Sequence, residues 1–132
     1  MRFPCLRTLL FSAGIAAFAG AAGCGSTETT ATAYLTWQIV DAKAPDPNTA
    51  PALTCESKSV GSIRVQIFPS TTGSLIDFPC SSMAGQTHSV PAGSYTIQTI
   101  ALSTTSQALA ELTFEQRLFG QTNLGHIIFQ IP

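Results

Sequence analysis

The chain has 132 residues, a formal net charge of −1, 45% hydrophobic residues and 10% charged residues. This length is enough for one ordinary domain, and the low charge content is typical of a compact chain rather than a disordered one. No basic patch is present, so the sequence excludes nucleic acid as an expected partner.

The N-terminal 23 residues have the pattern of a secretory signal peptide. Arg2 and Arg7 give a basic start, residues 9–22 form an apolar run, and small residues end it at Gly23. The run is shorter than the roughly 20 apolar residues of a membrane span. This favours a cleaved signal over the alternative of a retained transmembrane anchor. We expect residues 1–23 to be removed, which leaves four cationic against seven acidic side chains and a net charge near −3.

The sequence AAGC at residues 21–24 resembles the lipobox of bacterial lipoproteins, in which small residues precede a cysteine. The resemblance implies that Cys24 receives a diacylglycerol and that several acyl chains hold the protein stably on a membrane of the cell envelope. Because Gly25 stands where an aspartate favours inner-membrane retention, the resemblance implies the outer membrane. The alternative is plain secretion after Gly23, with Cys24 free or paired. Residues 24–32 are expected to form a flexible tether.

Residues 33–132 alternate between apolar and polar side chains with the period of two that is typical of β-strands. The segments that show this pattern are 33–40, 62–68, 75–80, 87–90, 94–102, 108–116 and 126–131. Turn-rich stretches such as GQTNLG at 120–125 separate them. Ala, Leu and Glu in 108–116 also favour a helix, but the β-rich setting favours a strand. We predict an all-β fold, an immunoglobulin-like or transthyretin-like antiparallel sandwich of about seven strands.

The alternation also predicts which side chains enter the core. These are Leu35, Trp37, Ile39, Ile63, Val65, Ile67, Ile127, Phe129 and Ile131. Both faces of segment 94–102 are largely apolar, which predicts a central strand. Trp37 is the only tryptophan, and a core position is favoured for it over a carbohydrate-stacking platform.

Segment 42–54 differs in kind from the predicted strands. Pro45, Pro47 and Pro51 argue against a hydrogen-bonded ladder, so we expect a long loop. The simpler interpretation is a surface excursion that is pinned at its ends. The alternative is a loop that binds a ligand.

Cys55 and Cys80 form an even pair in an exported chain, because Cys5 falls in the signal and Cys24 takes the lipid. This arithmetic predicts one disulfide. A two-cysteine metal site and two free thiols are alternatives, but a metal site needs further Cys or His at short spacing. We expect no metal and no cofactor.

Pro91, Gly93 and Tyr95 form a Pro-x-Gly-x-Tyr turn before a long predicted strand. Together with the segment that begins at Cys55, this resembles the small β-sandwich domains of bacterial surface lipoproteins, which are related in shape to transthyretin-like and carboxypeptidase-regulatory-like domains. The resemblance covers roughly residues 33–131 and implies an architecture rather than an activity. We expect the Tyr95 ring to be buried at the core edge, with its hydroxyl near backbone acceptors.

The sequence contains no recognisable catalytic constellation. His88 and His126 are isolated and are expected to face solvent from strands, and Glu111 and Glu115 stand about 13 Å apart along one strand, farther than glycosidase carboxylates. No nucleophile elbow or phosphate-binding glycine loop occurs. We therefore expect a non-enzymatic structural or interaction module with an envelope protein or glycan as partner. The alternative is a glycan- or peptide-binding module that uses the 42–54 loop or a sheet edge.

Overall fold

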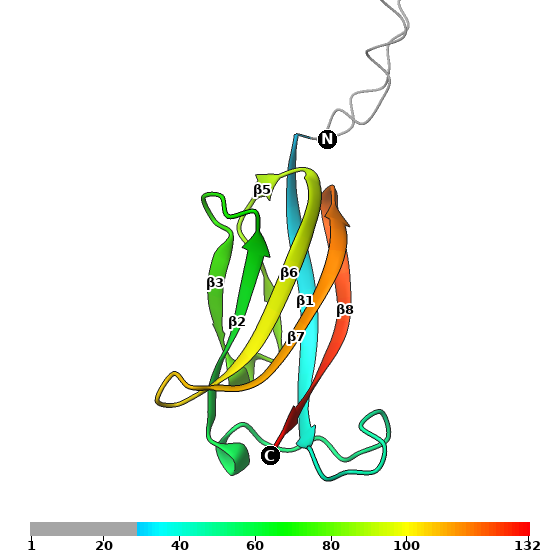
Figure 1. Cartoon of the computed structure of the whole chain (residues 1–132), viewed down its shortest axis with the longest axis vertical. Coiled ribbons are helices and arrows are strands. Elements are labelled where there is room, and N and C mark those ends of the chain that lie inside the picture. The colour runs from blue at the N-terminus through cyan, green and yellow to red at the C-terminus, as the bar shows by residue number, and fades with distance from the viewer. Residues whose placement is uncertain (1–28) are drawn as a thin grey trace, which may run out of the picture.

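The structure, a computed structural model, describes residues 29–132, which fold as an all-β sandwich (Figure 1). The strands are β1 (Thr30–Asp41), β2 (Val60–Phe68), β3 (Leu75–Pro79), β4 (Ala84–Gln86), β5 (Val90–Pro91), β6 (Gly93–Ser103), β7 (Ala108–Leu118) and β8 (Gly120–Ile131). Two short 3₁₀ turns, η2 (Glu56–Lys58) and η3 (Cys80–Ser82), lie in the connections. The predicted signal peptide, Cys24 and most of the predicted tether lie outside the described residues.

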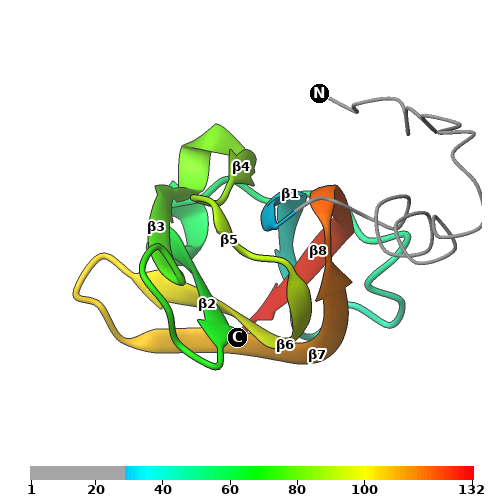
Figure 2. The same cartoon turned by 90° about the horizontal axis from the view of Figure 1, so that it is seen from above.

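The strands form two layers that face each other across one core (Figure 2). The β6 sheet has the order β3-β2-β6-β7 and is antiparallel throughout. In the β1 sheet, β1 pairs with β8 on one side and with the short β4 and β5 on the other. The predicted all-β sandwich is therefore confirmed, with eight strands among residues 29–132 instead of about seven.

One pairing departs from the predicted antiparallel arrangement, because β1 and β8 run parallel from Ala31 beside Gly120 to Asp41 beside Ile131. The prediction of a turn at residues 120–125 is wrong, since these residues form the first half of β8. Polar side chains there hide the strand pattern. A bulge at Gly125, whose φ is +89°, then interrupts the alternation.

The predicted strand at residues 87–90 is also wrong, since β4 ends before it and β5 contains only its last residue. Thr87 binds β1 with both its backbone and its side chain. Its N–H donates to the Ala33 carbonyl (2.8 Å), and its hydroxyl accepts a hydrogen bond from the Ala33 N–H (2.9 Å). The side chain thus replaces a second ladder bond, so the segment is fixed to β1 without continuing a strand.

The other predicted strands are confirmed, including the ambiguous segment 108–116, which lies within β7. β6 pairs with both β2 and β7 and is the central strand that its two apolar faces predict. The third predicted strand ends at Pro79, because Cys80 begins η3. The predicted tether is wrong at its last three residues, because β1 begins at Thr30 and residues 30–32 are paired with β5 and β8.

The core is built as the alternation predicts, and each of the predicted core residues is buried. Trp37 is its largest side chain and is 1% exposed. The indole Nε1–H donates to the carbonyl of Cys80 (3.0 Å), and the ring centroid lies 5.8 Å from that of Phe78. Gly85 lies against the Phe78 ring, where a Cβ atom would approach to 2.6 Å. Trp37 is therefore a core residue and cannot serve as a carbohydrate platform.

The sandwich is elongated and has two ends, at which different connections gather (Figure 1). The N-terminal end contains Thr30, the β2–β3 connection at 69–74, and Phe119 between β7 and β8. The loop end contains residues 42–58 and the β6–β7 turn at 104–107. β1 joins the two ends, and its 12 residues span about 36 Å at roughly 3.3 Å per residue.

Candidate functional site

An open depression of about 370 Å³ lies on the β6 sheet near the N-terminal end. It is lined by Phe68, Pro69, Ser94, Tyr95, Thr96, Glu115, Gln116 and Arg117. Phe68, Thr96 and Glu115 are neighbours in one cross-strand row of β2, β6 and β7, so they share a face of the sheet. This face points away from the core, because Ile67 and Ile97 on the opposite face are buried.

The depression combines an exposed aromatic ring with two charged side chains that have no partner within residues 29–132. Phe68 is 38% exposed, and Glu115 and Arg117 are exposed on β7. Neither charged side chain forms a hydrogen bond or an ion pair within residues 29–132. An apolar surface beside acceptor and donor groups can bind a small polar ligand with apolar faces, such as a sugar unit. Alternation after Ile67 could have placed Phe68 on this outer face from the sequence alone.

Tyr95 has a structural role in the depression, and its hydroxyl is not available to a ligand as a donor. Its ring is 7% exposed, and its hydroxyl donates to the carbonyl of Pro91. The prediction of a buried ring with a backbone-bonded hydroxyl is therefore confirmed. Because its one donor is already used, the Tyr95 hydroxyl fixes the turn that starts β6.

Beside this region, Arg64 of β2 and Asp77 of β3 form a two-point ion pair, with Nε 2.8 Å from Oδ1 and Nη2 3.0 Å from Oδ2. These hydrogen bonds are the main reason that the pKa of Asp77 is held below its ordinary value, and they raise the pKa of Arg64. Both groups are more than one-third exposed, so the pair contributes at most about 1 kcal/mol to stability. Each charge is already satisfied and is not offered to a ligand.

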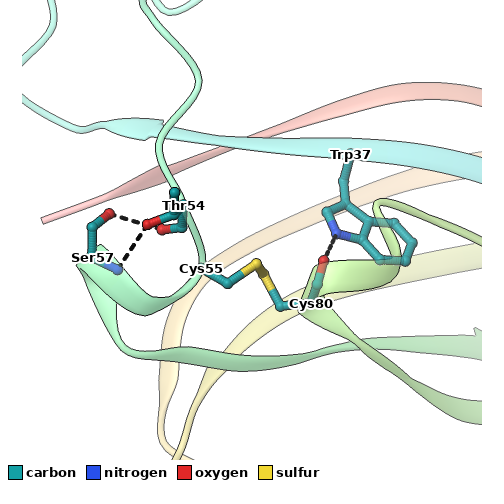
Figure 3. Close-up of a disulfide and its surroundings, with 5 residues drawn as sticks. All are labelled: Trp37, Thr54, Cys55, Ser57 and Cys80. Carbon is teal, nitrogen blue, oxygen red and sulfur yellow. Dashed lines mark hydrogen bonds between the residues drawn. A yellow bond between two sulfur atoms is a disulfide. The ribbon is translucent and has the colours of Figure 1, made fainter.

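The two cysteines that the sequence pairs do form a disulfide, with their Cα atoms 6.0 Å apart (Figure 3). Cys55 ends the long loop, and Cys80 begins η3 where the chain crosses between the sheets. The turn after Cys55 is fixed by Thr54, whose hydroxyl accepts from the Ser57 N–H (3.2 Å) and whose carbonyl accepts from the Ser57 hydroxyl (2.8 Å). The disulfide therefore ties the loop to the junction of the two sheets.

The 42–54 loop is held to β1 at both of its ends. The Lys43 N–H donates to the Asp41 carboxylate (2.8 Å), and the Leu53 N–H donates to the Ile39 carbonyl (2.7 Å). Leu53 also packs against the core. These contacts favour the simpler interpretation of the loop, a pinned surface excursion.

Two long strand edges are unpaired within residues 29–132, since β7 bonds only to β6 and β8 bonds only to β1. An open edge can accept an added strand from a peptide. However, β7 carries Glu111, Glu115 and Arg117, and β8 contains the bulge at Gly125, both of which discourage strand addition. The depression therefore has better support as a ligand site than either edge.

No group of three His, Cys, Asp or Glu side chains within residues 29–132 is placed to hold a metal ion. His88 and His126 are exposed, and only His126 lies in a strand, where its Nδ1 is 2.8 Å from Thr36 Oγ1. A hydroxyl beside an imidazole is one part of a nucleophilic site, which also needs a group that orients the ring. In the described part of the chain no carboxylate bonds to the His126 ring, and the pair lies on the other sheet from the depression.

Comparison of the chain with protein-family models, curated proteins and solved structures finds no match. Within the part of the chain that the structure describes, no helix has the length and apolar character that a membrane crossing requires.

Proposed function

We propose that this chain is a lipid-anchored protein of the cell envelope, in which the sandwich is a non-enzymatic structural or interaction module. The observation that carries the proposal is the position of Cys24, which directly follows the signal-like residues 1–23 and stands six residues before Thr30, the start of β1. The disulfide between Cys55 and Cys80 supports an exported chain, because such bonds persist in oxidising compartments. Gly25 stands where an aspartate would favour retention in the inner membrane, so we place the anchor in the outer membrane. The two-sheet architecture and the Tyr95 turn support the likeness to transthyretin-like lipoprotein domains.

Under this proposal, the loop end of the sandwich faces away from the membrane. The lipid on Cys24 is joined through the chain to Thr30, at the N-terminal end of the sandwich. The loop at 42–54 lies about 36 Å away from this end along β1. A partner in the envelope would then meet the loop end or the broad face of the β6 sheet.

The anchor is tested on the mature protein purified from membranes. We expect mass spectrometry of the N-terminal peptide to show Cys24 as the first residue, with a diacylglycerol on its thiol and an acyl chain on its amine. We expect Cys24→Ser to remove the protein from the membrane fraction, because several acyl chains are needed for stable anchoring. Cys5→Ser is the matched control and should leave anchoring intact. An unmodified Cys24, or an N-terminus elsewhere, would refute the anchor.

A second candidate function is glycan binding, and the depression beside Phe68 favours it over the 42–54 loop. Soluble fragments of envelope glycans can be titrated against the protein by calorimetry. If this function is correct, Phe68→Ala should weaken binding by about tenfold or more, as expected for an aromatic side chain that carries much of the contact energy. Leu75→Ala, an exposed apolar change outside the depression, is the control and should have little effect. Equal affinity for the wild type and for Phe68→Ala would exclude the depression.

A further inference from the structure

Three of the six large apolar side chains that are exposed within residues 29–132 lie at the N-terminal end of the sandwich, and two of these three are the most exposed of the six. Phe119 is 56% exposed, Leu75 is 49% exposed and Phe68 is 38% exposed. Phe68 ends β2, Leu75 begins β3 directly after the connection at 69–74, and Phe119 links β7 to β8 at the same end (Figure 1). Large apolar side chains in water are usual when single, but a group at one end of a domain suggests a contact surface.

The corner that carries Phe119 is fixed before any partner arrives. The hydroxyl of Thr122 accepts a hydrogen bond from the Phe119 N–H (3.2 Å) and donates one to the Phe119 carbonyl (3.0 Å). Thr122 itself is 9% exposed and is anchored in β8. The backbone is therefore held in a conformation that keeps the Phe119 ring outside the core. Binding through this ring would cost little further ordering of the chain.

Charged side chains are scarce at the N-terminal end, where the exposed apolar side chains lie, and are frequent at the loop end. No Asp, Glu, Lys or Arg occurs in residues 65–76, 86–94 or 118–125, which form the N-terminal end. The loop end and the last residue of β1 together contain Asp41, Lys43, Asp46, Glu56 and Lys58. Within residues 29–132, Glu115 and Arg117 on β7 are the charged side chains that line the depression near this end. An end of this kind loses little hydration when it is pressed against an apolar or interfacial surface.

The length of the chain before Thr30 indicates what covers this end. Five residues, 25–29, separate Cys24 from Thr30. At a maximum of about 3.6 Å per residue, the acylated thiol lies within roughly 22 Å of the start of β1. The bilayer surface is therefore always within reach of Phe68 and Phe119. Because the tether holds the two surfaces together, even a weak contact is strongly populated.

We infer that the N-terminal end of the sandwich docks on the lipid bilayer, with Phe68, Leu75 and Phe119 inserted at the interface between headgroups and acyl chains. The inference rests on the proposed lipid anchor at Cys24. Aromatic and leucine side chains are the residues by which interfacial segments bind membranes. The docked domain stands with its charged loop end pointing away from the membrane, and the lipid tether and the apolar contacts together fix its orientation.

The test uses the full mature chain, purified from membranes and reconstituted into phosphatidylcholine vesicles that contain brominated lipid. Three variants each add one tryptophan: Phe119→Trp, Phe68→Trp and Gln107→Trp. Gln107 is exposed in the turn at the loop end and is the matched control. Trp37 is buried, and its emission, measured in the wild type, is subtracted from that of each variant. Flotation of each variant with the vesicles is measured first, because it reports the anchor alone.

We expect blue-shifted emission from tryptophan at positions 119 and 68, with loss of that emission in brominated vesicles, and neither change at position 107. Two variants at the N-terminal end guard against one that folds poorly. A chain that does not float with vesicles would refute the proposed anchor. A chain that floats, but whose tryptophans at 119 and 68 are quenched no more than the one at 107, would overturn the docking and leave the anchor standing. In that case, cross-linking at position 119 to a second copy or to another protein identifies the alternative occupant.

Discussion

Removing the Cys55–Cys80 disulfide is expected to lower the free energy of unfolding by about 3.5 kcal/mol. The bond joins residues 25 apart in the sequence, and closing a loop of that length restricts the unfolded chain. Both cysteines are buried, so serine in their place also leaves polar groups in the core. For a domain of this size, Cys55→Ser with Cys80→Ser should lower the melting temperature by well over about 10 °C, at 4–8 °C per kcal/mol.

The measurement is calorimetric melting of the mature protein, with Cys24→Ser as the control for the mere exchange of a cysteine. The control should melt at the temperature of the wild type, since Cys24 precedes Thr30, the first residue of β1, by six positions in the sequence. Thiol titration of the denatured, unreduced protein is the complementary test. Two free thiols from Cys55 and Cys80 in protein made in an oxidising compartment would contradict the expectation.

The second large effect is expected at Trp37, where truncation to alanine should cost about 3–5 kcal/mol. The indole fills the centre of the core at 1% exposure and packs on Phe78. Its loss opens a cavity and removes one of the two hydrogen bonds to the Cys80 carbonyl, which keeps the one from the Met83 N–H (3.2 Å). Trp37→Phe fills most of the space but loses the hydrogen bond, so it should cost less than Trp37→Ala.

Urea denaturation followed by circular dichroism measures these differences. Tyr34→Ala is the matched control, because Tyr34 lies on the same strand but is 40% exposed. Its effect should stay within about 0.5 kcal/mol. The role assigned to Trp37 is wrong if the midpoint falls no further for Trp37→Ala than for Tyr34→Ala. Because the indole bonds to Cys80, the effects of the Trp37 and disulfide changes should not be additive.

Strands with a buried face were predictable because period-two alternation reports burial directly. Ile63, Val65 and Ile67 on β2 illustrate this, since each is fully buried and their neighbours face outwards. The disulfide was predictable for a different reason, because Cys55 and Cys80 are the pair left once Cys5 is assigned to the predicted signal and Cys24 to the predicted lipid. The alternation is read within one segment and the cysteines are simply counted, so neither prediction needs knowledge of the topology.

The parts that were not predictable depend on pairing between distant segments. β4 is Ala84–Gln86, a stretch without strong strand formers, and it exists because β1 pairs with it and because Gly85 accommodates the Phe78 ring. Residues 120–125 carry turn signals, yet pairing with β1 makes them strand. Local propensity is a weak guide in such places, because the partner strand decides the conformation.

The depression also depends on topology. Phe68, Thr96 and Glu115 come from three strands, and only the register of β2, β6 and β7 brings them into one row. Alternation could place Phe68 on the outer face, but it could not supply the other two. The N-terminal end proposed to dock on the bilayer has the same origin. Phe68 and Phe119 are far apart in the sequence, and the topology places both at this end of the sandwich.

The parallel pairing of β1 with β8 has a consequence for the order in which the protein folds. The first strand of the sandwich finds its longest partner in the last, because β4 and β5 offer β1 only three and two residues. Such high contact order slows folding, since a loop of most of the domain must close before these contacts form. The β1 sheet cannot be completed until β8 is present. Under the proposed export with the N-terminus first, this sheet therefore stays incomplete until β8 has crossed the membrane, whereas the β6 sheet contains no residue of β8.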